Sequence, residues 1–224
     1  SDSPKNWDTL AALDCILSNT SRNAAILDAG GESYSVMLPW LQLYGYRNLV
    51  GINLAFDKPW QRGRIRYEYG DITQTRFPDA TFDAVACLSV IEHGVSVQAY
   101  FAEMGRIVKP GGLLITSCDY WEEGIDTRGQ VAFGVPIRVY SKRDIQEVIS
   151  IGTTNDFMLL GDVDMECKEK AVSWKEYGLE YTFMMISMCK NAGKGAGLRL
   201  ANNHILSRAG RLYRGRHKAS EGHG

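Results

Sequence analysis

AAILDAGGES, residues 24–33, is a short apolar run that ends in an acid and a glycine pair. The run Ala24–Asp28 predicts a buried strand. Gly30-Gly31 predicts a tight turn after it, because glycine has no Cβ and lets the backbone turn sharply and approach a ligand closely. The stretch does not match the dinucleotide fingerprint G-x-G-x-x-G, since Glu32 and Ser35 stand where glycines are needed. It therefore predicts a strand, a turn and a ligand site of another kind.

Strand-like and helix-like stretches alternate on both sides of this turn. Further strands are expected at Leu49–Leu54, Ile65–Tyr69, Phe82–Ser89, Leu113–Ser117, about Phe157–Val163 and Tyr181–Met188, and helices at Trp7–Leu17, Ser35–Tyr44, Gln98–Ile107 and Lys142–Ile149. Pro39 indicates a late start or a kink in its helix. The alternation predicts an α/β fold whose mostly parallel, seven-stranded sheet has helices on both faces and an antiparallel last strand.

Charge is distributed unevenly along the chain. From Lys190 onward there are eight basic residues and one acid, whereas the residues before Lys190 carry a net charge of −8. The glycine-rich stretch 192–197 indicates a linker. We therefore expect one domain over residues 1–191 and a basic extension over 192–224. The extension either contacts nucleic acid or an anionic membrane, or is a solvent-exposed tail or a helix docked on the acidic body.

Cysteine usage and hydropathy indicate a cytoplasmic protein. The five cysteines are scattered and include no C-x-x-C pair, which argues against a disulfide framework or a structural zinc site. No apolar run is long enough to span a bilayer, and no secretory signal is expected at the N-terminus. The sequence does not indicate an oligomeric state.

Four further segments follow the first turn in a definite order. Asn53 ends the second expected strand, Asp71 follows the third, and Ser89–His93 follows the fourth. Pro110-Gly111-Gly112 then precedes the fifth strand. Because the carboxyl ends of parallel strands share one edge of a sheet, these polar residues are expected to gather around one ligand.

These segments resemble the class I S-adenosylmethionine-dependent methyltransferases, in particular the small-molecule, methyltransferase type 11-like branch. The matching stretches are ILDAGG (26–31), YGDI (69–72), FDAVACLSVIEH (82–93) and RIVKPGGLLI (106–115), and the resemblance covers about residues 22–118. It implies a Rossmann-like methyltransferase fold and S-adenosylmethionine as the cofactor. By the same resemblance, Asp28, Gly30 and Gly31 line the methionine end of the cofactor, Asn53 the ribose, Asp71 and Ile72 the adenine, and Ser89 the cofactor face of the fourth strand.

Two residues depart from the family pattern. Glu32 replaces a further glycine, so the loop conformation is expected to differ. Asn53 replaces an acid that accepts both ribose hydroxyls, and an amide accepts through one oxygen only and has no charge. The sequence therefore predicts weaker cofactor binding that Asn53→Asp would tighten, unless Asp57 reaches the ribose instead.

The acceptor side is less clearly marked. His93 is a candidate general base, with the alternative that Glu92-His93 is a structural element. The expected loop Cys118–Pro136 starts with Asp119 and Tyr120, also candidate catalytic residues. Aromatic rings and acids suit a polyhydroxylated or cationic acceptor, and acids can hold a divalent metal, although no clear metal motif is present. We expect O-methylation of a small molecule or glycan; the alternatives are N-methylation of an amine, RNA methylation, or a non-catalytic binding module.

Overall fold

The computed structural model describes residues 6–167 and 169–193, so the expected basic extension lies almost entirely outside the described residues. A central sheet of nine strands has the order β10-β11-β6-β5-β1-β2-β4-β3, and β9 also pairs with β11. The strands are β1 (Ala25–Ala29), β2 (Asn48–Asn53), β3 (Trp60–Arg62), β4 (Ile65–Tyr69), β5 (Phe82–Leu88), β6 (Val108–Tyr120), β7 (Val131–Ala132), β8 (Val135–Pro136), β9 (Phe157–Leu159), β10 (Val172–Trp174) and β11 (Leu179–Lys190). The five strands from β6 to β4 are parallel to one another.

The predicted α/β class and the antiparallel last strand are confirmed, since β11 pairs antiparallel with β6. The sheet has nine strands where seven were expected. The additional strands β3 and β10 have three residues each, too few for an alternating pattern to reveal them. The β6 strand is also much longer than expected, so Asp119 and Tyr120 lie in a strand and not in a loop. Pairing with β11 along its length explains this extension.

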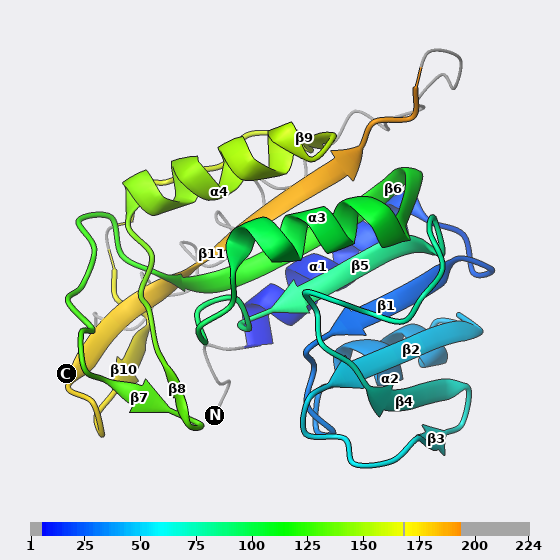
Figure 1. The fold of residues 1–224 in the computed structure, drawn as a ribbon, viewed down its shortest axis with the longest axis horizontal. Coiled ribbons are helices and arrows are strands. Elements are labelled where there is room, and N and C mark those ends of the chain that lie inside the picture. Colours follow the sequence, from blue (N-terminus) through cyan, green and yellow to red (C-terminus); the bar gives the residue numbers. More distant parts are fainter. Residues whose placement is uncertain (1–5, 168, 194–224) are drawn as a thin grey trace, which may run out of the picture.

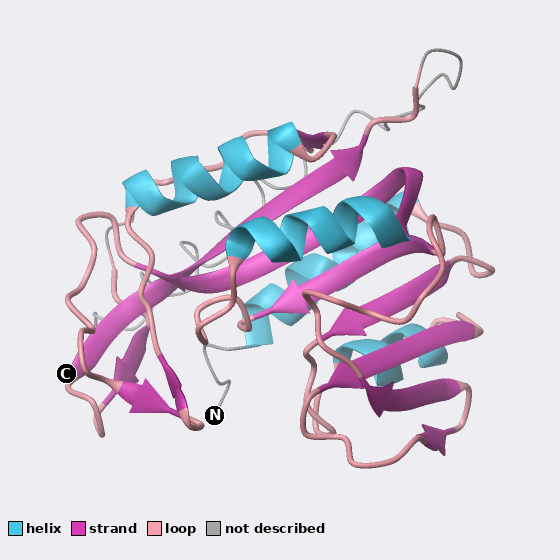
Figure 2. Cartoon of the chain, in the orientation of Figure 1, coloured by secondary structure: helices cyan, strands magenta, loops and turns pink. Residues whose placement is uncertain are grey.

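Helices cover both faces of the sheet, as Figures 1 and 2 show. Helices α1 (Asn6–Asn19) and α2 (Met37–Leu43) lie on one face, and α3 (Val97–Ile107) and α4 (Lys142–Thr154) on the other. Successive strand residues point to opposite faces, so Ile26 packs in the core with α1 and α2 while Leu27 packs in the core with α3. The late start predicted from Pro39 is confirmed, because α2 begins at Met37.

A third apolar cluster, here called the aromatic lobe, lies beyond the sheet. Its buried members come from the β7–β8 region and from the start of β11, and partly buried aromatic residues pack around them. The buried residues are Ala132, Ile137, Val139, Leu179, Tyr181 and Phe183, and the surrounding aromatics are Trp7, Trp121, Trp174 and Tyr177. Because Trp7 belongs to α1, the first helix contacts both the sheet and the lobe.

No helix within residues 6–167 and 169–193 combines the length and the apolar character that crossing a bilayer requires.

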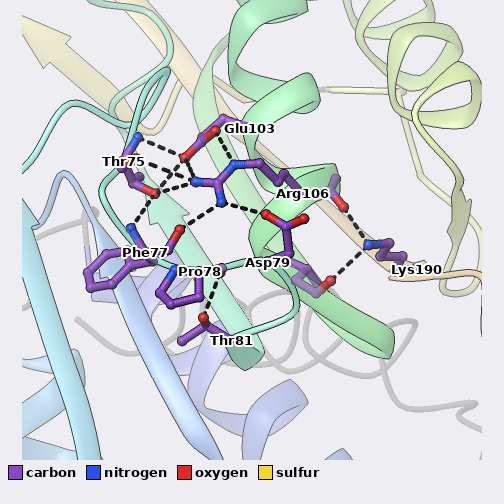
Figure 3. Close-up of polar contacts among 10 residues, drawn as sticks. Thr75, Phe77, Pro78, Asp79, Thr81, Glu103, Arg106 and Lys190 are labelled. Carbon is purple, nitrogen blue, oxygen red and sulfur yellow. Dashed lines mark hydrogen bonds and ion pairs between the residues drawn. The ribbon is translucent and has the colours of Figure 1, made fainter.

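A partly buried arginine–glutamate contact links the segment after β4 to α3 (Figure 3). Arg106 donates to both carboxylate oxygens of Glu103, to the Phe77 carbonyl at 2.7 Å and to Asp79 at 2.8 Å. The backbone N–H and the hydroxyl of Thr75 donate to the same Glu103 carboxylate. Lys190 of β11 donates to the carbonyls of Gly105 and Val108 at the end of α3. These bonds hold residues 75–79 against the helix.

Arg106→Ala is expected to lower the free energy of unfolding by about 2 kcal/mol, because the buried Glu103 carboxylate loses its cation. The loss is smaller than for a fully buried pair, since a third of the Arg106 side chain is exposed. Urea unfolding measures it. Arg128→Ala is the matched control, because the Arg128–Asp126 pair is exposed to solvent, and its unfolding should match the wild type. Equal unfolding curves for the two variants would show that the Glu103–Arg106 contact adds nothing.

Candidate active site

The glycine turn after β1 is required by its own packing. Gly30 has φ +93°, a left-handed conformation that side chains rarely adopt, and its N–H donates to the Ile52 carbonyl at 2.8 Å. A Cβ on Gly31 would lie 2.2 Å from an oxygen of Asp28. The turn therefore folds directly over the Asp28 carboxylate. Since β1 is followed by β2 on one side and lies beside β5 on the other, this turn stands at the switch point of the sheet, where such folds bind ligands.

Asp28 is a buried acid, 2% exposed, whose Oδ2 accepts from the Ser35 hydroxyl at 2.9 Å. Burial raises the pKa of Asp28 to about 6, opposed by the Ser35 hydrogen bond and supported by the nearby charge of Asp8. A cation bound beside Asp28 would lower this pKa and favour the ionised carboxylate.

Asp8 of α1 is a second buried acid, and sequence reasoning missed it. Its Oδ2 accepts from the Ser117 hydroxyl at 2.9 Å and from the Ser89 hydroxyl at 3.4 Å, so it ties α1 to the ends of β5 and β6. Burial raises the pKa of Asp8, and the Ser117 hydrogen bond acts in the opposite direction. A signal was present in the sequence, because Asp8 falls on the apolar stripe of its helix with Ala11, Ala12 and Cys15.

Asn53 holds the glycine turn in place. Its Nδ2 donates to the Gly30 carbonyl at 2.9 Å and lies 3.4 Å from the Gly31 carbonyl. Its Oδ1 accepts from the Ala55 N–H at 2.8 Å. An aspartate at this position could accept from Ala55 but could not donate to the turn. The amide therefore supplies both the donor that the glycine turn needs and the acceptor that the Ala55 N–H needs. This gives a physical reason for the departure from the family pattern.

Asn53→Asp is consequently expected to weaken cofactor binding about tenfold or more, the opposite of the expectation from sequence. The carboxylate would replace a donor with a charge facing two carbonyl oxygens. Isothermal titration with S-adenosylhomocysteine measures the change. Asn48→Asp is the matched control, because Asn48 begins the same strand and donates to the exposed Asn23 carbonyl. Tighter binding by Asn53→Asp would restore the ribose-acceptor interpretation.

The adenine-side residues differ in exposure. Asp71 is half-buried, and its Oδ1 accepts from the N–H and the hydroxyl of Thr73 at 2.8 and 2.7 Å. These two bonds fix the orientation of the carboxylate through Oδ1. Ile72 is buried in the core that contains Ile52. At the same edge of the sheet, Leu54 and Tyr69 are large apolar side chains that remain exposed.

Ser89, directly after β5, has φ +54°, a conformation unusual for a residue with a side chain. Its N–H donates to the Ser117 hydroxyl at 3.0 Å and lies 3.2 Å from the Ser117 carbonyl. Left-handed backbone at non-glycine positions costs of order 1 kcal/mol and concentrates at functional sites. The structure thus brings Ser89, Asp8 and Asp28 to one edge of the sheet.

Asp119, expected from the sequence on the acceptor side, lies at the base of the aromatic lobe. Strand alternation places it on the same face as Ser117, and it is 5% exposed. It pairs across the sheet with Phe183, whose ring lies 6.3 Å from the ring of Trp7. Burial raises the pKa of the neighbouring Tyr181, and the nearby Asp119 raises it further, so this phenol keeps its proton.

The other two acceptor-side candidates, Tyr120 and His93, make different contacts. Tyr120 follows Asp119 in the strand and therefore points to the opposite face, into the core with α3 and α4. Its hydroxyl donates to the Met165 carbonyl at 2.6 Å. His93 is half-buried, and its ring packs edge-on against Phe133 in the β7–β8 turn, with centroids 5.6 Å apart. Of the two candidates in β6, Asp119 is therefore the one on the face of Ser117.

The acids of residues 118–126 do not form a metal site. Asp119 is buried in β6, whereas Asp126 forms an exposed ion pair with Arg128. In the described ranges, no group of three or more His, Cys, Asp or Glu side chains is arranged to hold a metal ion.

Known proteins share this fold and these segments. Residues 27–116 match the family described as "Methyltransferase domain". A demethylmenaquinone methyltransferase of Deinococcus radiodurans is 41% identical over 117 residues, which are 50% of this chain and 48% of that protein. A sterol 24-C-methyltransferase of Pneumocystis carinii is 22% identical over 150 residues, 58% of this chain and 39% of that protein. The crystal structure of an S-adenosylmethionine-dependent methyltransferase from Mesorhizobium loti superposes with a TM-score of 0.58 at 16% identity, covering 82% of this chain and 98% of that one.

The chain has the Rossmann-like fold of the solved methyltransferase structures. The match over residues 27–116 and the shared fold agree with the resemblance to the class I S-adenosylmethionine-dependent methyltransferases seen in the sequence. The chain spans less than half the length of the two curated relatives above, so their activities and acceptors are not carried over as a whole.

The residues at the switch point fit S-adenosylmethionine. Asp8 and Asp28 are buried carboxylates, and in the described part of the chain their hydrogen-bond donors are neutral groups of serine and threonine. Their negative charge therefore suits the sulfonium and ammonium groups of the cofactor. The exposed apolar side chains of Leu54 and Tyr69 suit a planar base beside Asp71.

Proposed function

We propose that this chain transfers a methyl group from S-adenosylmethionine to a hydroxyl oxygen of a small molecule or glycan. The observation that carries the proposal is the buried Asp119 carboxylate at the base of the aromatic lobe, opposite Phe183 in the β6–β11 pair. When bound, the cofactor supplies an electrophilic methyl group. A hydroxyl becomes a good nucleophile toward it only if a base accepts its proton.

Each neighbouring group has a definite task in this proposal. Asp119 accepts the hydroxyl proton, because a carboxylate can act as a general base toward a hydroxyl bound beside it. Tyr181 lies near Asp119 and keeps its own proton. The rings of Trp7 and Phe183 exclude water from the acceptor and offer faces on which a sugar or an aromatic ring can stack. Correct alignment of oxygen and methyl carbon supplies the remaining acceleration.

Methyl transfer to a panel of acceptors tests the proposal. The purified full chain is given methyl-labelled S-adenosylmethionine with sugars, phenols, amines, RNA or prenylated quinones, and the labelled products are hydrolysed to identify the methylated atom. Label in an ether is the expected result. Label only on nitrogen or in RNA contradicts O-methylation, and binding of S-adenosylhomocysteine with no transfer to any acceptor favours a non-catalytic module.

A second candidate is methylation of a carbon in an apolar acceptor. The names of the two curated relatives, a sterol 24-C-methyltransferase and a demethylmenaquinone methyltransferase, favour it, and so does the aromatic lobe. The quinone arm of the same panel separates the two candidates, because a carbon-bound methyl group survives ether cleavage.

A further inference from the structure

Helix α2 has an apolar face that the described residues leave uncovered. Met37, Leu38 and Leu41 pack into the core. The residues on the other side, Val36, Trp40, Leu43 and Tyr44, recur at intervals of three or four and are all large, apolar and exposed. We call these four residues the α2 face. Leu43 is 82% exposed. A surface helix ordinarily carries polar groups outward, and one that is apolar all round is normally covered on both sides.

Arginines border the α2 face at the amino ends of the parallel strands. Arg22, Arg47, Arg62 and Arg64 are exposed, and we call them the basic rim. The Arg22 guanidinium lies 5.0 Å from the ring of Tyr46, just after α2. The N–H of Arg64 donates to Gln42 within α2, so the β3–β4 turn lies beside the helix. In Figure 1, α2 lies behind β2 and β4, toward the edge of the sheet opposite β11.

The charge of this region is opposite to that of the chain before the extension. Residues 33–56 contain no acid, and Arg47 is their single charged residue. Residues 58–67 contain four basic residues and no acid. Residues 1–189 as a whole carry a net charge of −8. A positive surface on an otherwise acidic body complements an anionic partner.

We propose that the α2 face and its basic rim dock the protein on an anionic lipid surface. Tryptophan and tyrosine favour the boundary between lipid headgroups and acyl chains, and arginine is attracted to anionic headgroups. Val36 and Leu43 add aliphatic area that enters lipid but contributes little to binding nucleic acid. A second copy of the chain would cover the apolar residues, but a two-fold contact would bring the basic rims close together.

Vesicle sedimentation with the full chain tests the proposal and is independent of methyl transfer. The wild type is expected to sediment with phosphatidylcholine vesicles that contain about one-third phosphatidylglycerol, less with pure phosphatidylcholine, and less as salt screens the charges. Arg62→Glu combined with Arg64→Glu should lower the partition coefficient about tenfold or more. Leu43→Gln should lower the partition coefficient several-fold at low salt and at high salt alike, because the contribution of Leu43 is apolar.

Matched variants elsewhere separate this surface from general stickiness. Met158→Gln changes an exposed apolar residue of β9, and Arg143→Glu reverses an exposed charge on α4, and both should sediment as the wild type does. Wild-type sedimentation by the Leu43 and Arg62/Arg64 variants would overturn the proposal. The proposal would also be overturned if the wild type failed to bind the vesicles. It would be overturned if the Arg62/Arg64 variant lost binding to RNA but still bound the vesicles, or if light scattering showed a wild-type dimer that Leu43→Gln dissociates.

Discussion

Replacing Asp119 with asparagine is expected to lower kcat for methyl transfer about a hundredfold or more, while the affinity for S-adenosylhomocysteine stays within about twofold. Asparagine fills the same volume, so the fold and the cofactor site are preserved. It cannot accept the proton of a hydroxyl, and the transfer step loses its base. A lower kcat with an unchanged affinity for S-adenosylhomocysteine would show that Asp119 acts as a base. A purely structural role would change the affinity as well.

Steady-state kinetics with the acceptor found in the panel, together with titration calorimetry, measures both quantities for Asp119→Asn. Asp126→Asn is the control, because Asp126 belongs to the same acidic segment but is exposed and paired with Arg128. It should leave kcat unchanged. Full turnover by Asp119→Asn, or an equal loss in both variants, would remove Asp119 from the mechanism.

Asp28→Asn is expected to stabilise the protein at neutral pH and to weaken cofactor binding at the same time. The pKa of Asp28 is about 6 in the folded chain against an ordinary value of 3.8, so the folded state prefers the protonated form. Between these two values the folded chain binds more protons than the unfolded chain, and its free energy of unfolding falls as pH rises. Above pH 6 the cost is constant, at up to about 3 kcal/mol. Asparagine carries no such cost.

Urea unfolding between about pH 4 and pH 8 measures this effect, and the variant should gain most above pH 6. Some pH dependence will remain in the variant, because burial raises the pKa of Asp8 in the same direction. Asp14→Asn, at an exposed position of α1, is the control. Titration with S-adenosylhomocysteine should show at least about tenfold weaker binding by Asp28→Asn. A variant no more stable than the wild type at neutral pH would show that the Asp28 carboxyl is not strained by burial.

The parallel core of the sheet was predictable because each of its strands is a local apolar run bounded by turn residues. The predicted strand Ile65–Tyr69 coincides with β4, and Phe82–Ser89 differs from β5 by one residue. The late start of α2 followed from the fixed geometry of Pro39. These features depend on a few neighbouring residues, which a single sequence displays.

Contacts between distant segments were not predictable in the same way. Asp119 and Tyr120 are neighbours in sequence, but pairing with β11 carries β6 through both of them, and alternation then sends them to opposite faces. The bond from Ser117 to Asp8 joins residues 109 positions apart. The Asn53 amide could be recognised as a departure from the family, but its partners in the glycine turn required coordinates.

The long β6–β11 pair also determines how an acceptor can enter. Eight successive residue pairs, from Tyr120 opposite Thr182 to Leu113 opposite Cys189, run without a break from the sheet to the base of the aromatic lobe. A hinge needs a short, weakly bonded crossing, and a continuous ladder of this length resists bending. The lobe and the sheet are therefore expected to move together. Trp7 in the first turn of α1 packs against Phe183, the strand partner of Asp119, so we expect access to Asp119 to depend on movement of that turn and not on domain closure.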